Sequence, residues 1–328
     1  MIVPAVLPPE FSQLSALAAR THHEPISCEI LPGDVGRRRY VRLVLRDNRS
    51  VLGVVYPQEE ADSRRRWSAA RAALRDRIRV PLLIADDQAG NQIVEDFGRM
   101  DLATRFLESP ADRGTWLAKA VAAGSAFAGM DDPKINPPFD AVLFRRELDL
   151  AREAVFDLYL KEPLSPDERA VHDRWAECLA QEIAAHPLAL CHRDFHGNNL
   201  FPFDSEVAAI DFQDMRSGPD SYDLASLLWE RTTLDWMTAE AAEEAIERFV
   251  RARGIQRGPF RRRFDRVLLQ RAWKVCGTFA RAVAQGRGEA YRHYLPGEIA
   301  LVGRLLSDNP EDAAFAALFE ARLSPLLS

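Results

Sequence analysis

The sequence lacks several features that would assign it to common protein classes. No uninterrupted apolar run approaches the ~18 residues that a membrane-spanning helix requires. The four cysteines lie far apart and form no C-x-x-C pair, so we expect neither a zinc site nor a disulfide framework. The first ten residues have no basic segment and do not resemble a secretory signal. These absences predict a cytoplasmic protein with no membrane partner.

An excess of basic charge is also missing. The chain has 328 residues, with 43 Lys and Arg against 49 Asp and Glu and a net charge of −6. Nucleic acids would not be attracted to such a chain overall, so no nucleic-acid partner is expected. We interpret the arginine-rich stretch 248–266 as a solvated helix face and loop; a basic patch for an anionic ligand is the alternative.

The hydrophobic pattern changes once along the chain. After a short amphipathic helix at 11–18, alternating apolar residues predict antiparallel strands at 26–30, 40–46, 51–56, 82–85 and 92–95, with a helix at 59–77. Beyond residue 98, apolar residues at three- and four-residue steps predict helices at 102–107, 116–128, 142–160, 168–185 and from 222 onward. Two short apolar strands are expected among them, at 188–191 and 207–210. The pattern indicates an α+β fold with a small antiparallel-sheet lobe, 1–97, and a larger, mostly helical lobe, 98–328.

A very polar segment, 192–199, lies between the two short apolar strands. Asp194 and Asn199 are five residues apart within it, and Asp211 ends the following strand. Carboxylate and amide oxygens are the ligands that Mg²⁺ prefers, and Mg²⁺ takes its remaining ligands from water and phosphate. A second carboxylate would then be free to accept a proton from an attacking hydroxyl. This combination is typical of phosphoryl transfer.

The same residues resemble the catalytic and metal-binding loops of the protein-kinase-like superfamily. His192-Arg193-Asp194, followed by Asn199 and then by Asp211-Phe212, carries the resemblance. It implies a two-lobed protein-kinase-like fold, ATP and Mg²⁺ as cofactors, Asp194 as the catalytic base, and Asn199 and Asp211 as metal ligands. We interpret His192 as a buried brace of the loop and Gly197 as a residue that permits a tight turn.

The segment after Asp211 is too short for a protein-substrate platform. Gly218-Pro219 and a helix containing Asp223 follow almost at once, and no Ala-Pro-Glu motif is present. This arrangement resembles the aminoglycoside phosphotransferase and choline kinase group, which phosphorylates small molecules. The resemblance implies that Asp223 braces the catalytic loop and that no protein substrate is used.

A closer resemblance is to the bacterial anomeric sugar kinases. It is carried by 210–214, 218–219, 222–224, 269–271, 274–275 and 279–281. Those enzymes phosphorylate the C1 hydroxyl of N-acetylmuramate and N-acetylglucosamine during cell-wall recycling, which implies the same activity here. Two alternatives stay open: an aminoglycoside- or choline-type phosphotransferase, and a non-catalytic nucleotide-binding module.

The expected nucleotide site departs from the usual kinase pattern. Gly33 and Gly36 offer only two glycines for a phosphate-binding turn, and 51–56 contains no lysine. The neighbouring arginines, above all Arg38 and Arg39 but also Arg37 and Arg42, are candidates to replace it. Strand alternation requires some of them to face solvent. Glu95 and Phe97 belong to a segment that resembles the hinge between the lobes, where backbone groups would pair with adenine.

For the acceptor we expect a neutral or anionic sugar. Asp214 is a candidate to accept a hydrogen bond from a sugar hydroxyl, and His196 either lines the substrate site or caps the loop. Arg216 or Arg271 would supply the cation for a carboxylate on the sugar. Lys274 and Trp273, near Arg271 in the sequence, are candidates for a wall of the substrate site.

Overall fold

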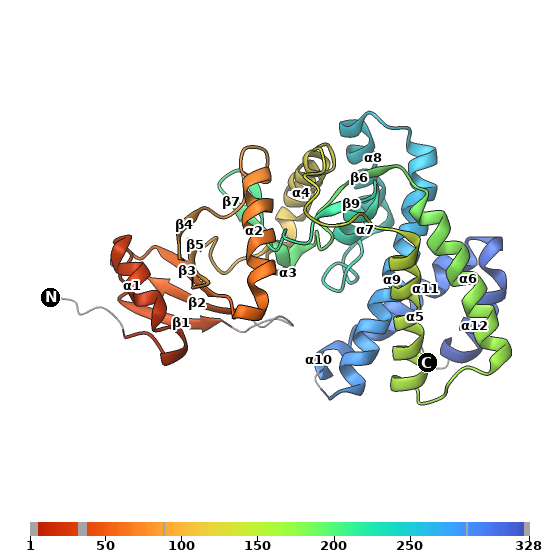
Figure 1. Ribbon diagram of the computed structural model, residues 1–328. Helices are drawn as coiled ribbons and strands as arrows, with labels where there is room; N and C mark the ends of the chain where they lie inside the picture. Colours follow the sequence, from red (N-terminus) through yellow and green to blue (C-terminus); the bar gives the residue numbers. More distant parts are fainter. Residues whose placement is uncertain (1–5, 32–37, 88, 287, 325–328) are drawn as a thin grey trace. The chain divides into compact units, whose positions relative to one another are not determined.

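The computed structural model describes residues 6–31, 38–87, 89–286 and 288–324, without the side chains of residues 289 and 290. The chain divides into two compact units. Their helices and strands are labelled in Figure 1. Unit 1 contains residues 1–110 and 197–214, and unit 2 contains residues 111–196 and 215–328. This division differs from the expected lobe boundary at residue 97, because the chain returns to unit 1 for the segment that carries Asn199 and Asp211.

Unit 1 is built on an antiparallel sheet in the order β1-β2-β3-β5-β4. The strands are β1 (Ser27–Leu31), β2 (Arg39–Val44), β3 (Ser50–Val55), β4 (Leu83–Asp86) and β5 (Asn91–Glu95). The register pairs Val41 with Gly53, and Gly53 with Ile93. The predicted antiparallel sheet is confirmed.

Helix α1 (Gln13–Arg20) covers one face of this sheet (Figure 1). Its apolar side packs on a core formed by alternate strand residues. The buried residues of this core include Leu14, Leu17, Val41, Leu43, Val51 and Ile93. The intervening strand residues face the opposite side of the sheet, where the candidate nucleotide site lies.

Three further elements complete unit 1. They are α2 (Ala61–Leu74), α3 (Leu102–Glu108) and a hairpin of β7 (Leu200–Phe203) and β8 (Glu206–Ala209). Asp101 caps α3 by accepting a 2.7 Å hydrogen bond from the Thr104 N–H, which satisfies one of the unpaired donors at a helix start. The Ala209 N–H donates to the Arg79 carbonyl at 2.8 Å, so the hairpin is tied to the sheet side of unit 1.

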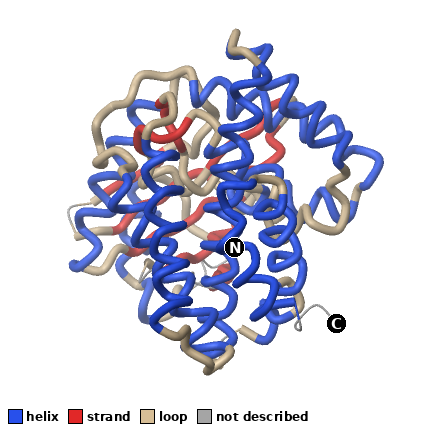
Figure 2. The backbone as a smooth tube through the Cα atoms, turned by 90° about the vertical axis from the view of Figure 1, so that its right-hand side faces the viewer, coloured by secondary structure: helices blue, strands red, loops and turns tan. Residues whose placement is uncertain are grey.

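Unit 2 is mostly helical, in keeping with the helices that dominate the backbone in Figure 2. Its helices are α4 (Arg113–Ala128), α5 (Ala141–Arg152), α6 (Pro166–Ala184), α7 (Tyr222–Leu228), α8 (Ala239–Arg253), α9 (Arg257–Ala284), α10 (Glu289–Arg292), α11 (Leu295–Ser307) and α12 (Ala313–Leu323). A capping box of Ser165 and Glu168 starts α6. Helix α9 packs against α5, α7 and α11 and carries the fully buried Trp273.

The structure adds detail to unit 2 at two places. The helix expected over 142–160 is α-helical to Arg152 and continues as a π-helix at Glu153–Tyr159. The segment with Gly218-Pro219, for which no strand was predicted, forms β9 (Arg216–Pro219) and pairs with β6 (Leu188–Cys191). Proline is tolerated at this strand end, and a Cβ at Gly218 would overlap the Phe139 ring. Within the described residues, no helix combines the length and apolar character that crossing a bilayer needs.

Candidate active site

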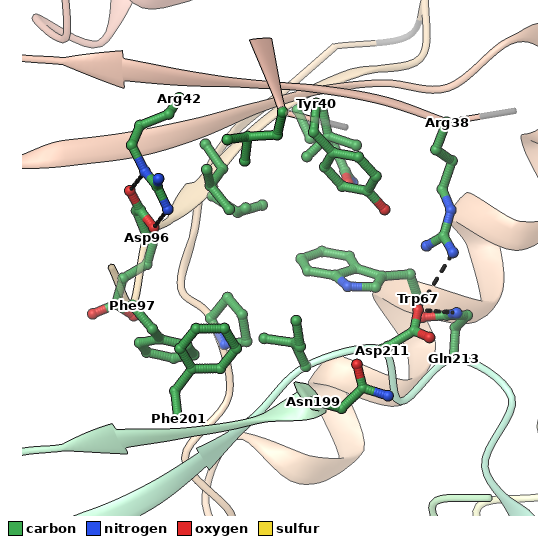
Figure 3. A pocket seen from close by; sticks show the side chains of 18 of the residues that line it. Arg38, Tyr40, Arg42, Trp67, Asp96, Phe97, Asn199, Phe201, Asp211 and Gln213 are labelled. Carbon is green, nitrogen blue, oxygen red and sulfur yellow. Dashed lines mark hydrogen bonds and ion pairs between the residues drawn. The ribbon is translucent and has the colours of Figure 1, made fainter. Parts of the chain in front are cut away.

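A pocket of about 460 Å³ lies within unit 1 (Figure 3). It lies on the sheet face opposite α1, because its strand residues alternate with those of the core that α1 covers. Its apolar lining comes from Leu31, Leu52, Val54, Val94, Phe201 and Ile210. The strands supply one wall, and the β7–β8 segment supplies the other. Polar residues gather toward two ends, with Asp96 at one and Asp211 at the other, as Figure 3 shows. An apolar slot between polar ends suits a flat heterocycle that carries charged groups.

Strand alternation selects which arginines reach this pocket. Arg38, Tyr40 and Arg42 line it from β2 and the residue before it. Arg39 lies on the opposite face, with its guanidinium carbon 5.9 Å from the centre of the Phe11 ring. The geometry therefore does not bring Arg39 to the pocket, contrary to its expected role, because successive side chains of a strand point to opposite faces.

The hinge-like end of the pocket is organised around Asp96, whose side chain is 1% exposed. Its carboxylate accepts hydrogen bonds from Arg42 Nε and Ser50 Oγ, both at 2.6 Å, and from the Gly98 N–H at 2.9 Å. Burial disfavours its ionisation, but these hydrogen bonds hold the pKa of Asp96 below its usual range. The charged carboxylate fixes the backbone of this segment. Nothing in the sequence pattern pointed to this role.

Glu95 and Phe97 also line the pocket, and their side chains are held by neighbours. Glu95 forms an ion pair with Arg79 and accepts a 3.1 Å hydrogen bond from the Leu82 N–H. The Phe97 ring packs edge-on against Phe203, with centroids 5.2 Å apart. Both side chains thus fix the position of the backbone here.

The other end of the pocket contains both expected metal ligands. Asn199 ends a short 3₁₀ turn before β7, and Asp211 follows β8. The Ile210 N–H donates to the Asn199 carbonyl at 3.0 Å, so the two side chains start from adjacent backbone positions. Figure 3 shows both at the same side of the pocket. Asp211 has a φ of +61°, a left-handed conformation that is uncommon outside glycine and that Asp adopts more readily than most residues.

Neighbouring side chains hold Asp211 and the residue after it. Arg38 Nη2 donates to Asp211 Oδ1 at 3.3 Å, and Gln213 Nε2 donates to the same oxygen at 2.7 Å. Phe212 is fully buried and stacks on Trp67 of α2, with centroids 5.8 Å apart and planes at 26°. The contact of Trp67 with Phe212 could not be predicted from the sequence, because the two residues lie far apart along the chain. Gln213 lay inside the recognised motif without an assigned role.

The residues at this end fit a divalent cation. Asn199 and Asp211 offer an amide oxygen and a carboxylate, a hard-oxygen donor set that leaves room for phosphate and water ligands. Asp214 also lines the pocket, and its Oδ1 lies 4.0 Å from Arg66 Nε. Asp214 therefore belongs to the same pocket as Asp211, in unit 1. Gly33, Gly36 and Arg37 lie outside the described residues.

Gly197 is required by close packing. A Cβ at this position would lie 2.8 Å from the Ala103 backbone nitrogen, at the start of α3. Gly197 begins the 3₁₀ turn Gly197–Asn199, and its φ is not positive, so glycine is needed here for the close approach between the loop and α3.

In unit 2, the carboxylate of Asp223 holds the start of the expected catalytic loop. It accepts hydrogen bonds from the N–H groups of His192 at 2.6 Å and Arg193 at 3.0 Å. The fully buried His192 ring packs against Phe127 and Phe195, with both centroid separations 5.7 Å. Arg193 has a φ of +86°, so the backbone is strained directly before Asp194. Two hydrogen bonds to a buried carboxylate stabilise this conformation.

The surroundings of Asp194 keep it ionised. Burial disfavours the charged form, but the positive charges of Lys274, Arg193 and Arg271 hold the pKa of Asp194 below its usual range. Burial lowers the pKa of His196 to about 4, so its imidazole is neutral at pH 7. An ionised Asp194 beside a neutral histidine is in the protonation state that a base or a hydroxyl-orienting group needs.

The expected substrate cations of unit 2 have different partners. Arg271 donates to Ser226 Oγ at 2.7 Å and to the Arg193 carbonyl at 3.3 Å, so it supports the backbone directly before Asp194. Lys274 Nζ lies 3.1 Å from Glu147 Oε1, and this buried glutamate was missed by the sequence analysis. The guanidinium carbon of Arg216 lies 5.4 Å from the centre of the Phe139 ring.

Trp273 is fully buried, beside Phe156 and Phe315. It belongs to the core of unit 2, so the expectation that it forms a wall of the substrate site was wrong.

Comparison with known proteins decides the family. Residues 27–266, well over half of the chain, match the model of a phosphotransferase enzyme family. The chain belongs to this family. It is therefore an enzyme that transfers a phosphoryl group, and the predicted relationship to the aminoglycoside phosphotransferase and choline kinase group is confirmed.

Relatives of this phosphotransferase include two proteins named N-acetylmuramate/N-acetylglucosamine kinase. The protein from Neisseria meningitidis is 28% identical over 282 residues, which cover 80% of each chain. The protein from Pseudomonas aeruginosa is 27% identical over 308 residues, covering 87% of this chain and 90% of the relative.

Among solved structures, a choline/ethanolamine kinase family protein from Mesorhizobium loti has the same fold. The two chains superpose with a TM-score of 0.61 at 18% identity, over 95% of the phosphotransferase and 98% of that chain. The predicted protein-kinase-like α+β fold is confirmed.

Proposed function

We propose that this phosphotransferase is an ATP- and Mg²⁺-dependent kinase of a hexose or amino sugar that acts on the anomeric C1 hydroxyl. Its substrates would be of the N-acetylmuramate and N-acetylglucosamine type, and its role the recycling of cell-wall sugars in the cytoplasm. The observation that carries the proposal is similarity over four fifths of the chain to proteins named for these two sugars. The site described above supplies groups suited to that chemistry.

Each group has a chemical role in this proposal. The ionised Asp194 orients the acceptor hydroxyl and takes its proton as the oxygen attacks the γ-phosphorus. The bond from the γ-phosphorus to the β,γ-bridging oxygen breaks, and ADP leaves with that oxygen. Asn199 and Asp211 would hold Mg²⁺, which when bound neutralises charge on the phosphates. The apolar slot would accept adenine, with the backbone near Asp96 positioned by the Arg42 hydrogen bonds.

The charges around Asp194 favour a neutral or anionic acceptor. Lys274, Arg193 and Arg271 all place positive charge near this carboxylate. A polycationic aminoglycoside would be repelled by such surroundings, whereas a neutral or carboxylate-bearing sugar would not. In place of the expected Arg271, Lys274 is our candidate for the cation that meets a substrate carboxylate, because Arg271 already holds Ser226 and Arg193.

One observation favours a second candidate, a nucleotide-binding module without catalysis. Strand β3, Ser50–Val55, carries no lysine. A chain that had lost its phosphate-binding cation would bind nucleotide weakly or without turnover. The ionised Asp194 and the pairing of Asn199 with Asp211 in one pocket favour the kinase.

Two measurements separate these functions. Thermal shift with Mg·ATP tests binding, and ATP turnover is then measured with N-acetylmuramate, N-acetylglucosamine, an aminoglycoside and choline. The proposal predicts stabilisation by Mg·ATP and turnover with the two acetylated sugars. Stabilisation without turnover on any acceptor would favour the binding module, and turnover confined to the aminoglycoside or choline would show the alternative kinase class.

A further inference from the structure

The strand wall of the nucleotide pocket has little positive charge of its own. Strand β3 contributes Leu52 and Val54 to the lining, and α2 contributes the Trp67 indole. Among the described residues that line the pocket, the cations are Arg38 and Arg42. A nucleoside triphosphate in this pocket would therefore depend on one of these two guanidinium groups, in addition to a metal ion.

Arg42 is already bound at the Asp96 end. Its Nε and Nη2 donate to the two oxygens of Asp96 at 2.6 and 3.1 Å, and Nη2 also donates to the Gly98 carbonyl at 2.8 Å. Both side chains of this pair are at most 9% exposed. Releasing Arg42 to a phosphate would leave a buried carboxylate without its partner, which is strongly unfavourable.

Arg38 lies at the opposite end, beside the expected metal ligand. Its side chain is 17% exposed, and one 3.3 Å contact joins it to Asp211 Oδ1. The Tyr40 ring lies 6.0 Å from its guanidinium carbon, and the Tyr56 hydroxyl also interacts with it. An arginine side chain stays protonated in proteins, so Arg38 is a permanent cation beside Asp211, with further N–H donors on its planar group.

We propose that Arg38 supplies the cation for the triphosphate that most kinases take from a lysine on the third strand. Its guanidinium would donate to phosphate oxygens next to the metal held by Asp211. Arg38 directly precedes β2, one strand away from the usual lysine position, and reaches the pocket because it lies on the same side as Tyr40 and Arg42. The inference rests on the proposed function in one respect, that ATP binds in this pocket.

Nucleotide affinity tests this role separately from catalysis. Isothermal titration calorimetry is run with adenosine, AMP, ADP and ATP on the full chain and on R38A and R38K. R39A is the matched control, because Arg39 is the adjacent arginine on the opposite face of β2. We expect R38A to weaken ATP binding by about 10- to 100-fold, the range for hydrogen bonds between charged groups, and to leave adenosine binding unchanged. R38K should recover part of the loss, and R39A should bind ATP as the unmodified chain does.

The same titrations in EDTA, without metal, distinguish a direct contact between Arg38 and phosphate from an effect of Arg38 on metal binding by Asp211. The loss in R38A should persist in EDTA if the guanidinium donates to phosphate itself. Equal loss for adenosine and ATP, an unchanged ATP affinity, or a loss that vanishes without metal would each overturn the proposal. If R38A does not fold, as judged by circular dichroism, R38K against R39K gives the same comparison. A full chain that binds no adenine nucleotide would overturn the proposed function as well, which a failure confined to R38A and R38K would not.

Discussion

The guanidinium of Arg42 donates hydrogen bonds to both carboxylate oxygens of Asp96, at 2.6 and 3.1 Å, and both side chains are almost completely buried. These residues are 54 positions apart in the sequence and join the second strand of the sheet to the hinge-like segment of unit 1. The pair therefore couples the stability of unit 1 to the shape of the pocket that Arg42 and Asp96 line.

Replacing Asp96 by alanine should destabilise the protein strongly. Removing one partner of a buried ion pair leaves the other charge uncompensated, at a cost of about 3–5 kcal/mol. Urea unfolding of D96A measures this loss. The double variant D96A/R42M should recover part of it, since no buried charge remains unpaired. A D96A protein as stable as the unmodified chain would contradict the role of this pair.

Replacing Asp194 by asparagine should abolish most of the activity without harming nucleotide binding. Asparagine keeps the shape of the side chain but cannot accept the hydroxyl proton, so we expect kcat to fall by roughly 10²–10⁴. Initial rates under saturating Mg·ATP provide the measurement, with ATP affinity as the control. An unchanged rate on the true substrate would remove Asp194 from this role.

Replacing Asp211 by alanine should weaken the binding of Mg·ATP more than the binding of ATP in EDTA. The variant loses the carboxylate expected to hold the metal, while the apolar slot is intact. Calorimetry with and without Mg²⁺ gives the comparison. D204A is the matched control, because Asp204 is an exposed acid in the turn of the same hairpin. Equal affinities for D211A and D204A would refute the metal assignment.

The buried carboxyl group of Glu298 should make the stability of the protein depend on pH. Glu298 is 1% exposed on α11, and burial, with a smaller effect of the Glu230 charge, raises its pKa to about 8. Between pH 4.5 and pH 8, Glu298 is therefore protonated in the folded state, whereas in the unfolded chain, where its pKa is 4.5, it has lost the proton. The stability contributed by this proton is complete below pH 4.5 and is lost as the pH rises toward 8, by up to about 1.4 kcal/mol per pH unit.

The variant E298Q removes this titration. The Tm of E298Q minus the Tm of the unmodified protein should rise between pH 5 and pH 8, and level off above pH 8. Calorimetric scans across this range are the measurement. A difference that stays constant over the whole range would show that Glu298 does not hold its proton in the folded state.

Replacing Lys274 should affect the phosphorylation of N-acetylmuramate more than that of N-acetylglucosamine. Lys274 lies 3.1 Å from Glu147 and is partly exposed near the charge of Asp194. If it meets a substrate carboxylate, K274M should lower kcat/KM for N-acetylmuramate at least about tenfold more than for N-acetylglucosamine, which has no carboxylate. Steady-state kinetics on both sugars decides this. Equal losses for both sugars would assign Lys274 to the support of the loop instead.

Local patterns predicted which residues lie close together within one unit, and long-range packing accounts for what they missed. Spacing placed Asn199 and Asp211 together, and both line the pocket of unit 1. The role of Asp194, which belongs to unit 2, stays a prediction. The choice between Arg38 and Arg39 required the exact strand register, which alternation alone does not give. The contact of Trp67 with Phe212 and the pair of Arg42 with Asp96 join distant segments, so no sequence window contains both partners.

The boundaries of the two units also depend on long-range contacts that the sequence pattern does not contain. A change in periodicity near residue 98 marked where strands give way to helices. It carried no information that residues 197–214 return to unit 1, because this return depends on contacts of the β7–β8 hairpin with Arg79 and Phe97. The strand β9 was missed because glycine and proline dominate its sequence, while its partner β6 supplies the pairing that defines it.

The most direct test of the account is phosphorus NMR of the products formed from Mg·ATP and a mixture of sugars that includes N-acetylmuramate and N-acetylglucosamine. The account predicts ADP together with a sugar phosphate whose phosphorus couples to the anomeric proton. A phosphate on any other hydroxyl, or no sugar phosphate from a protein that binds Mg·ATP, would contradict it.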